Sequence, residues 1–599
     1  MRRTKIRSLA VAVGVTTAVT GLGATALGAP TPSTGHAVSS SGTSDAAVVE
    51  AARTAAMAHA SATGLTKGEG LRAQDVMLDP EGARHVRFER THQGMPVLGG
   101  DLVVHLDHAL AYAGVTRAAG HEVKPATTKA KLTSAQAAAK AASVAKGKAG
   151  SAHLVVDARR GASALAYQVQ VSDSATTEAN GSRTVVIDAD TGKVRSDIPD
   201  NDGIVSPELR ETLRKRGESL TPATDNAPAG SGLGATTPAP AADGSFPRTV
   251  KGSGASLSLG TVPLTTTQTA PTTFLLKDPT RYGTETRDAK DQELDDYASS
   301  AQITSTTNKW GNGAVSSRTS AAVDAQYGIA ETLDFYKKTF GRKGIANDSQ
   351  GAHAMVHYAN KWANAAWSHE CQCMQYGDGD GKSFKKPLVN LDVTGHELTH
   401  GVVDATAKLE PTFQDANRQY GEPGSLNESL ADIFGSNVEF FTNSAKDTPD
   451  YLIGEKLGLA QKFMRRLDKP SLDRLGRTVD YWSPDVFYTE VHAGSGVSSH
   501  AYYLLAEGSG KKTINGVKYD SPTYDGGTVK GIGRTKASAI FYRALTRYMV
   551  STTDFHGARV ATLKAAKDLF GAGSAEYKTV DRAWTAVNVT AANTPEAHS

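Results

Sequence analysis

Three stretches of the chain differ in how their apolar and polar residues follow one another. In the first, residues 85–90 alternate with the period of two that is typical of a half-buried strand, and the turn Gln93-Gly94 follows. Further strands are expected at 95–105, 153–156, 166–171 and 184–187, with an alanine-rich helix at 134–145. Together these elements predict a small α+β unit that ends near residue 198.

The second stretch, residues 199–245, is rich in Pro, Ala, Thr and Gly and has no sustained apolar period. Such a composition cannot bury enough apolar surface to order itself, so we interpret this stretch as a linker. Because a linker between two folded parts is open to proteases, we place a maturation cut in its later part.

From about residue 246 the pattern changes again. Residues 250–320 are rich in Thr, Ser and Gly and predict short strands, whereas helical periodicity dominates from residue 321 onward. The helical segments are 321–340, 393–407, 426–441 and 534–549. We therefore expect a β-rich N-terminal lobe over 246–405 and a mainly α-helical C-terminal lobe over 406–599.

The first 29 residues have the pattern of a secretory signal peptide. Basic residues at positions 2, 3, 5 and 7 precede an apolar run from Leu9 to about Leu27, and small residues follow up to Ala29. This run contains Thr and Gly and has no partner span further on, so a retained membrane anchor is not expected. We predict that the chain is exported by the general route and is extracellular.

Composition narrows the possible partners. A chain of 599 residues is too long for one core, and its 39% hydrophobic and 21% charged residues are typical of folded soluble protein. A formal net charge of +3 over this length argues for neither nucleic acid nor acidic lipid as a partner.

The two cysteines, Cys371 and Cys373, exclude a four-cysteine zinc site. They are either free thiols or a local disulfide, which would be strained in so short a loop.

The candidate chemistry begins with His396-Glu397-Leu398-Thr399-His400. Two histidines four apart on a helix share one face, about 5–6 Å apart at Cβ, so both imidazoles can reach one zinc ion. Glu397 is turned about 100° around the helix, where it cannot be a ligand but can stand beside a metal-bound water. This arrangement is typical of metal-assisted hydrolysis.

A third ligand is expected from the segment Asn427-Glu428-Ser429-Leu430-Ala431-Asp432. Glu428 and Asp432 lie at i and i+4 on one helix face, where two like charges repel by about 0.2–0.5 kcal/mol. A metal bound by Glu428, with Asp432 accepting a hydrogen bond from a ligating imidazole, removes that penalty. A solvated acidic helix face is the alternative, and the upstream histidines favour the metal.

These two segments together resemble the thermolysin-type neutral metalloproteases. The resemblance covers roughly residues 246–595 and extends through 321–325, 364–367, 376–381 and 540–546. Residues 65–115 resemble the fungalysin/thermolysin-type part of that family's propeptide, and 125–198 its PepSY-like part. The resemblance implies an α+β fold, with two small α+β propeptide units before a two-lobed peptidase whose zinc site lies in the cleft between the lobes.

The resemblance also implies roles for individual residues. It makes His396, His400 and Glu428 zinc ligands, Glu397 the general base, and His492 the group that stabilises the tetrahedral intermediate. Asp432 and Asn427 would orient the imidazoles, while Asn364, the carbonyl of Ala365 and Arg465 would hold the substrate backbone. Arg466 is the alternative to Arg465.

Two parts of the family pattern are altered. The stretch 408–424 is longer than usual, and the family's oxyanion-binding tyrosine falls within it, where Phe413 or Tyr420 would take its place. The aspartate that supports the catalytic histidine is replaced by Phe487, so Asp485 or Glu490 would have to substitute for it.

The resemblance further implies a structural calcium and a substrate preference. One calcium ion is expected, because one carboxylate of the family's paired site is replaced by Leu452. Its ligands would be Asp392, Glu439, Asp450 and Glu455. The apolar residues Phe384, Val393, Ile453 and Met464 match the pocket for the residue after the cut bond, so a hydrophobic residue is expected there.

The resulting hypothesis is a secreted, monomeric zinc endopeptidase made as a zymogen. Its propeptide would assist folding and block the cleft, and its partners would be protein or peptide substrates rather than nucleic acid or membrane. One alternative is a secreted zinc-binding pseudoenzyme, which the rebuilt loop favours and intact Glu397 and His492 disfavour. Another is a narrow processing protease with the same chemistry.

Overall fold

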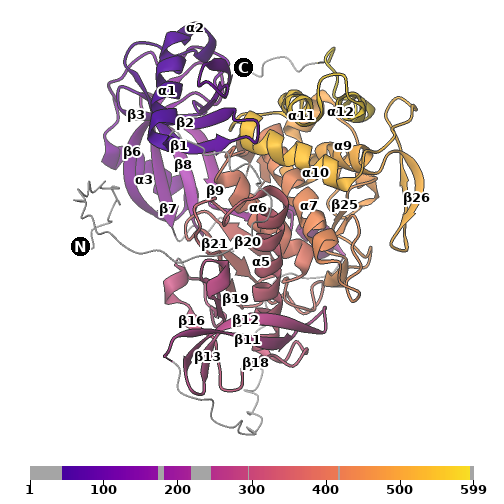
Figure 1. Ribbon diagram of the computed structural model, residues 1–599. Helices are drawn as coiled ribbons and strands as arrows, with labels where there is room; N and C mark the ends of the chain where they lie inside the picture. The colour runs from indigo at the N-terminus through magenta and orange to yellow at the C-terminus, as the bar shows by residue number, and fades with distance from the viewer. Residues whose placement is uncertain (1–43, 173–180, 217–244, 295, 416–417, 594–599) are drawn as a thin grey trace, which may run out of the picture. The chain divides into compact units, whose positions relative to one another are not determined.

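The computed structural model describes residues 44–172, 181–216, 245–294, 296–415 and 418–593 (Figure 1). The expected signal peptide and residues 217–244 of the expected linker lie outside these ranges. Within them, no helix has both the length and the apolar character needed to cross a bilayer.

Residues 45–199 form one nine-stranded sheet, on which two longer helices and one four-residue helix pack. The strand order is β5-β4-β2-β3-β6-β7-β8-β9, with β1 paired to β2, and parallel pairing of β3 with β6 joins the two expected propeptide units into one sheet. The strands are β1 (Glu69–Leu78), β2 (Arg84–His92), β3 (Met95–Leu98), β4 (Leu102–Leu106), β5 (Tyr112–Arg117), β6 (Lys148–Asp157), β7 (Ala164–Ser172), β8 (Arg183–Asp188) and β9 (Val194–Pro199).

Small residues let both helices lie close to this sheet. Helix α1 (Asp45–Ala58) buries Val48, Ala52 and Ala56, and α2 (Ala60–Thr63) follows it. Helix α3 (Ser134–Ala145) buries alanines at i and i+4, and the Thr133 side chain caps its first turn in a capping box with Gln136. The predicted helix at 134–145 and the strands predicted at 85–90, 153–156, 166–171 and 184–187 are confirmed.

The β-rich lobe contains two sheets. One has the order β17-β13-β12-β11-β18, and the other has the order β10-β20-β21-β19-β15-β14, with β16 paired to β15. Their strands are β10 (Asn201–Gly203), β11 (Arg248–Ala255), β12 (Thr261–Ala270), β13 (Thr273–Leu275), β14 (Lys277–Asp278), β15 (Thr284–Asp288), β16 (Ala301–Gln302), β17 (Thr304–Ser305), β18 (Lys309–Trp310), β19 (His353–Val356), β20 (Ala365–Ser368) and β21 (Cys373–Tyr376).

Two helices, α5 (Arg318–Phe340) and α6 (Leu391–Asp404), lie within the range expected for the first lobe. The second lobe is mainly helical, as expected, with α7 (Glu422–Thr442), α8 (Val491–Gly494), α9 (Gly496–Ala506), α10 (Arg534–Arg543), α11 (Phe555–Phe570) and α12 (Ala575–Ala586). Short hairpins interrupt them: β22 (Phe413–Asp415) with β23 (Arg418–Tyr420), β24 (Leu452–Ile453) with β25 (Arg465–Arg466), and β26 (Gly510–Ile514) with β27 (Val517–Ser521). The predicted fold class is confirmed.

Two glycines bring α6 and α7 close together where these helices run side by side (Figure 1). A Cβ placed on Gly395 would lie 3.0 Å from the Cα of Gly435, and a Cβ on Gly435 would lie 2.7 Å from the carbonyl oxygen of Asp392. Only glycine fits at such an approach. Because His396 follows Gly395 directly and Glu428 lies about two turns before Gly435 on α7, this crossing sets the distance between the expected zinc ligands.

Gly435→Ala is therefore expected to push the two helices apart. The added methyl group should lower the free energy of unfolding by about 1–3 kcal/mol, as overpacking does, and should lower the bound zinc content as well. Thermal unfolding and metal analysis measure the two effects. Gly573→Ala is the matched control, because a Cβ there meets nothing within 4 Å. Equal zinc content in both variants would contradict the proposed role of the crossing.

Candidate active site

The two histidines of α6 present their Nε2 atoms to one another. The Nε2 atoms of His396 and His400 are 3.0 Å apart, and both residues are fully buried. From α7, the Glu428 carboxylate lies 3.5 Å from Nε2 of His396 and 3.7 Å from Nε2 of His400. These three side chains thus place ligand atoms within 4.8 Å of one another, as their spacing in the sequence predicted.

On the side of each imidazole away from Nε2, the Nδ1 atom lies beside a residue that is expected to orient the ring. Nδ1 of His396 lies 2.8 Å from an oxygen of Asp432, and Nδ1 of His400 lies 3.0 Å from the side-chain oxygen of Asn427. An oxygen beside each Nδ1 favours a proton on that atom, which leaves the lone pair on Nε2.

Two Nε2 lone pairs at 3.0 Å repel each other unless a cation lies against both. In addition, one oxygen of Glu428 has no hydrogen-bond partner among the described residues, although it is buried. Burial lowers the pKa of His396 to about 3, so this ring is neutral, as a metal ligand requires. The donor set of two neutral imidazoles and one carboxylate fits a zinc ion.

Glu397 lies beside this set with both oxygens occupied. It accepts hydrogen bonds from the backbone N–H of Trp367 at 2.9 Å and from that of Ile204 at 3.2 Å. Burial, reinforced by the negative charge of Glu428, raises the pKa of Glu397 well above its ordinary value. A carboxyl group with a raised pKa is suited to exchanging protons near neutral pH.

His492 faces the same centre from α8. Its Nδ1 lies 2.7 Å from Glu490, which also accepts the backbone N–H of His492 at 3.0 Å. Glu490, rather than Asp485, therefore supports this histidine. Burial opposes the charged imidazole, but Glu428 and then Glu490 raise the pKa of His492 to about 9. At neutral pH the ring is a cation that can donate from Nε2.

The segment 201–205, just after the nine-stranded sheet, crosses the site. Strand β10 pairs antiparallel with β20, the strand that begins at Ala365. Nε2 of His492 donates to the carbonyl of Gly203 at 2.8 Å, and the N–H of Ile204 donates to the carbonyl of Ala365 at 3.1 Å. The side-chain oxygen of Asn364 accepts the N–H of Val205 at 2.9 Å.

Arg465 completes these contacts. It donates to the carbonyl of Ile204 at 2.9 Å and also binds both oxygens of Asp432 at 2.8 Å. Although burial alone would raise it, Arg465 and His396 hold the pKa of the Asp432 carboxyl well below its usual range. Arg466 pairs with Asp468 instead, so Arg465 is the arginine of the site.

This crossing was not anticipated, because residues from 199 onward were expected to be linker. The structure corrects that expectation up to residue 216, with β10 and then helix α4 (Pro207–Lys215), which buries Leu209 and Leu213. Its N-terminal signal was available in the sequence: Ser206 caps the helix and Pro207 begins it.

The lengthened loop forms the hairpin of β22 and β23. The Phe413 and Tyr420 rings stack with centroids 5.0 Å apart, and the Tyr420 hydroxyl interacts with Arg418. Hydrogen bonding at the Gly203 carbonyl comes from His492. The idea that Phe413 or Tyr420 replaces the oxyanion tyrosine stays a prediction.

A second cluster joins three of the four expected calcium ligands. Ligand oxygens of Asp392, Glu439 and Glu455 lie within 4.8 Å of one another, and neither oxygen of Glu439 has a hydrogen-bond partner in the described part of the chain. Asp450 is beside them, with one oxygen accepting the N–H of Leu452 at 2.7 Å. Burial, with the nearby charges, raises the pKa of Asp392 to about 7 and that of Asp450 to about 6.

The cluster also contains Asp447, which the sequence interpretation missed. This residue is 1% exposed, pairs with Lys456 at 2.9 Å, and is among the charges that raise the pKa of Asp392. Its position just before Asp450, in a turn that follows α7, is the signal that could have identified it.

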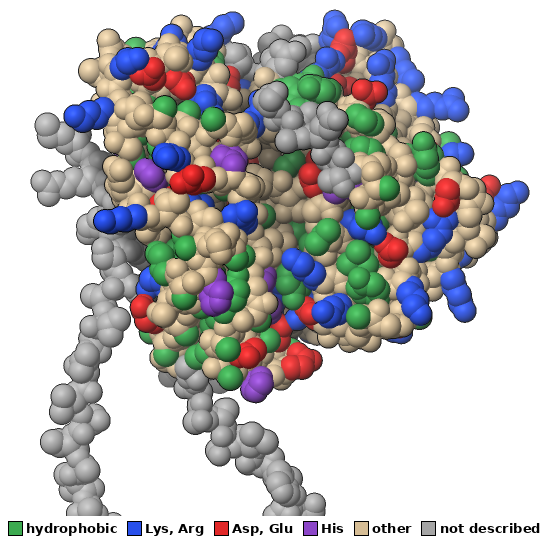
Figure 2. Space-filling view, turned by 90° about the horizontal axis from the view of Figure 1, so that it is seen from above, with side chains coloured by type: hydrophobic (Ala, Val, Ile, Leu, Met, Phe, Trp, Pro, Cys, Tyr) green, Lys and Arg blue, Asp and Glu red, His purple; other side chains and the backbone are tan. Residues whose placement is uncertain are grey.

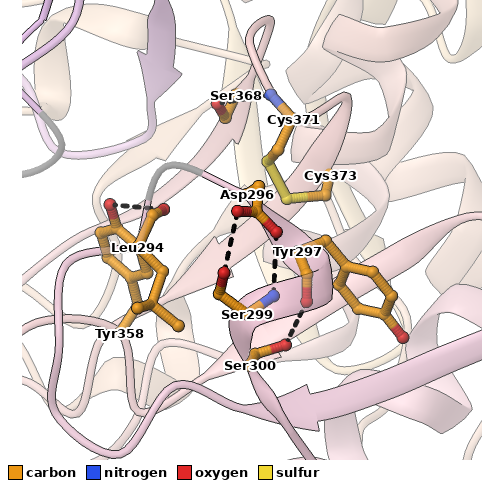
Figure 3. The surroundings of a disulfide bond; sticks show 9 residues. All are labelled: Leu294, Asp296, Tyr297, Ser299, Ser300, Tyr358, Ser368, Cys371 and Cys373. Carbon is orange, nitrogen blue, oxygen red and sulfur yellow. Dashed lines mark hydrogen bonds between the residues drawn. A yellow bond between two sulfur atoms is a disulfide. The ribbon is translucent and has the colours of Figure 1, made fainter. Parts of the chain in front are cut away.

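The two cysteines form a disulfide (Figure 3). It closes the turn between β20 and β21, where Ser368 pairs with Cys373. The Cα atoms of Cys371 and Cys373 are 5.2 Å apart, within the usual range for a disulfide, and the bridge lies beside Tyr297 and Tyr358 in a small apolar cluster. The alternative of free thiols is excluded in this structure.

Four family models match the chain. The fungalysin/thermolysin propeptide motif matches residues 69–109, and the peptidase propeptide and YPEB domain matches 131–198. The catalytic domain of thermolysin metallopeptidases matches 251–404, and their alpha-helical domain matches 416–589.

Individual relatives agree with these models. A transglutaminase-activating metalloprotease from Streptomyces mobaraensis is 37% identical over 535 residues, which is 88% of this chain and 62% of that protein. Bacillolysin from Bacillus cereus is 38% identical over 281 residues, 45% of this chain and 44% of its own length. The chain thus spans less than two thirds of these relatives.

A solved precursor of protealysin from Serratia proteamaculans is 26% identical and has a TM-score of 0.39; the match covers 51% of this chain and 87% of that one. Both peptidase domains and both propeptide motifs are matched in one chain and in the family's order. The chain belongs to the thermolysin family of metallopeptidases.

Proposed function

We propose that this chain is the precursor of an exported, monomeric zinc endopeptidase. One observation carries the proposal: Glu397 and His492 contact the two ends of a single peptide bond, at the N–H of Ile204 and the carbonyl of Gly203. The same two residues flank the expected zinc ligands, since Nε2 of His492 lies 3.4 Å from Glu428.

The chemistry follows from these contacts. Zinc held by His396, His400 and Glu428 would lower the pKa of water and polarise the scissile carbonyl. Glu397 takes a proton from the attacking water and passes it to the leaving nitrogen, which it already contacts at 3.2 Å. Charge that develops on the carbonyl oxygen is stabilised by His492, while Arg465 and Asn364 hold the backbone beyond the cut bond.

Substrate preference is proposed from what occupies the position after this bond. Ile204 is 0% exposed and is part of the large buried apolar core that runs from Ile204 to Val589, which also contains the expected pocket residues Phe384, Val393, Ile453 and Met464. This supports a hydrophobic residue after the scissile bond.

The same geometry bears on the two alternatives, a zinc-binding pseudoenzyme and a narrow processing protease. A pseudoenzyme would not need Glu397 and His492 aligned on one bond, so catalysis is favoured. The relative from Streptomyces mobaraensis is named for activating a transglutaminase. A narrow processing role with the same chemistry is therefore our second candidate, and it differs only in substrate range.

Zinc removal tests the proposed function. The processed enzyme is expected to lose casein cleavage with a zinc chelator and to regain it when zinc is added back in one equivalent. A calcium chelator at the same concentration is the control, assayed at once so that slow unfolding does not contribute. Full activity in a metal-free sample would refute a zinc endopeptidase.

We further propose one structural calcium ion, bound by Asp392, Glu439 and Glu455 with Asp450 and Asp447 beside them. The buried carboxylate of Glu439, which has no hydrogen-bond partner among the described residues, supports a hard cation there. Removing calcium is expected to lower the thermal midpoint by about 5 °C or more. In Glu455→Gln the midpoint should be low already and should respond little to calcium. A wild-type midpoint that ignores calcium would contradict the proposal.

A further inference from the structure

The propeptide crosses the site in the register of a substrate. Residues 201–205, the crossing segment, run antiparallel to β20. From the carbonyl of Gly203 to the N–H of Val205, each backbone polar group is met by a residue expected to bind or cleave substrate. These residues are His492, Glu397, Ala365, Arg465 and Asn364.

A segment that only blocked the cleft could do so without aligning one of its peptide bonds with the groups expected to cleave substrate. Here the carbonyl of Gly203 accepts from His492 at 2.8 Å, and the N–H of Ile204 donates to Glu397 at 3.2 Å. The groups that would stabilise the oxyanion and protonate the leaving amine therefore act on one bond. Gly203 also fits tightly, since a Cβ there would lie 2.5 Å from the side-chain nitrogen of Asn364.

The two sides of this bond are held by different parts of the molecule. On the upstream side, Asp200 accepts from Ser182 at 2.8 Å within the propeptide sheet, and Asp202 lies 3.2 Å from Nε2 of His369. This side is thus continuous with the nine-stranded sheet.

The downstream side is anchored on the helical lobe through α4. Glu208 pairs with Arg418 at 2.7 Å, and Thr212 donates to the carbonyl of Leu475 at 3.1 Å. Ile204 and Val205 are buried at 0% and 1% exposure. Cutting between Gly203 and Ile204 would leave these downstream contacts intact.

We propose that Gly203–Ile204 is the first bond that the precursor cuts in itself, and that residues 204–216 then stay in the site as a tethered product. This inference rests on the proposed endopeptidase function. Water adds across the bond: the C–N bond breaks, the water oxygen joins the carbonyl carbon as part of the new Gly203 carboxylate, and both water protons go to the new Ile204 amino group, which becomes an ammonium. A second cut downstream of residue 216 is then needed for full activity.

The test follows the precursor by mass spectrometry and N-terminal sequencing after zinc is added to metal-free protein. The first products are expected to end at Gly203 and begin at Ile204, at a rate that does not change with protein concentration. Glu397→Gln should remain uncut. Activity on a short peptide should stay low when this cut is complete and rise as residues 204–245 are lost.

Two further variants separate recognition from folding. Ile204→Asp should slow this cut at least about tenfold, because a charge would enter an apolar pocket. Val194→Asp, at a residue 43% exposed on β9, is the matched control and should be cut at the wild-type rate. Circular dichroism checks that both precursors are folded.

Several outcomes would overturn the inference. They are a first new N-terminus elsewhere while Gly203–Ile204 is intact, a rate that rises with concentration, and full activity as soon as the cut appears. A casein assay separates a failure of this inference from a failure of the proposed endopeptidase function. It uses enzyme whose propeptide has been removed by an added protease. If casein is cut while Gly203–Ile204 persists, only this inference fails; if casein is not cut, the proposed function fails.

Discussion

Replacing Glu397 with glutamine is expected to lower kcat for peptide hydrolysis by about 10²–10⁴-fold. The amide keeps the shape of the side chain but cannot take a proton from water or deliver one to the leaving amine. Bound zinc should be unchanged, because the ligand atoms come from His396, His400 and Glu428. Casein hydrolysis and metal analysis of the same samples measure both quantities.

A matched control is available in Glu331, which is half-buried on α5 and accepts a hydrogen bond from Thr442. Glu331→Gln also removes a carboxylate with a raised pKa, as burial raises that of Glu331, yet it should leave kcat unchanged. If the Glu397 variant with full zinc occupancy kept more than about a tenth of wild-type activity, Glu397 would not be the general base.

His492→Ala is expected to lower kcat by about 10²–10³-fold with little change in KM, since its hydrogen bond is strongest to the developing oxyanion. Glu490→Gln should have a smaller effect, because the imidazole is kept and loses only its charged partner. Steady-state kinetics on one peptide give kcat and KM for both variants. A raised KM with normal kcat in His492→Ala would mean that the residue only binds substrate.

The Glu490→Gln variant is also expected to change how the reaction rate depends on pH. Glu490 is one of the negative groups that raise the pKa of His492 to about 9, against the opposing effect of burial. Removing its charge lowers that pKa, so the imidazole loses its proton at lower pH. The alkaline limb of the rate profile should therefore move to lower pH in Glu490→Gln, and an unmoved limb would contradict this coupling.

The surface agrees with the modest net charge of +3. On the face seen in Figure 2, Lys and Arg side chains stand at the rim with Asp and Glu between them. The surface therefore has no strong electrostatic field of one sign, and the groups expected to bind and cleave substrate lie in the buried site.

Local patterns were enough to predict the parts of the site that one helix sets by itself. The spacing of His396 and His400 puts both rings on one face of α6, and the i,i+4 spacing of Glu428 and Asp432 does the same on α7. The family resemblance then related the two helices. It left two choices open, Asp485 or Glu490 beside His492 and Arg465 or Arg466 at the substrate, because segments without a helical period give no fixed direction for their side chains.

The tertiary structure answers several questions that the sequence left open. Glu490 and not Asp485 supports His492, and Arg465 and not Arg466 reaches the site. Asp447 joins the expected calcium cluster, and the two cysteines are bridged. For the histidine partner and for the arginine, nearby residues of the chain were alternatives for one place, and contacts between distant segments decide which of them occupies it.

By itself, the sequence determined the fold class, and it predicted an export signal and the two helices expected to hold zinc, since these depend on periodicity and motif spacing. Only the tertiary structure decided how closely α6 and α7 approach at Gly395 and Gly435, and that residues 201–205 cross the site. The physical reason is distance. Hydrogen bonds form only when atoms come within about 3 Å, and packing between remote segments sets such distances.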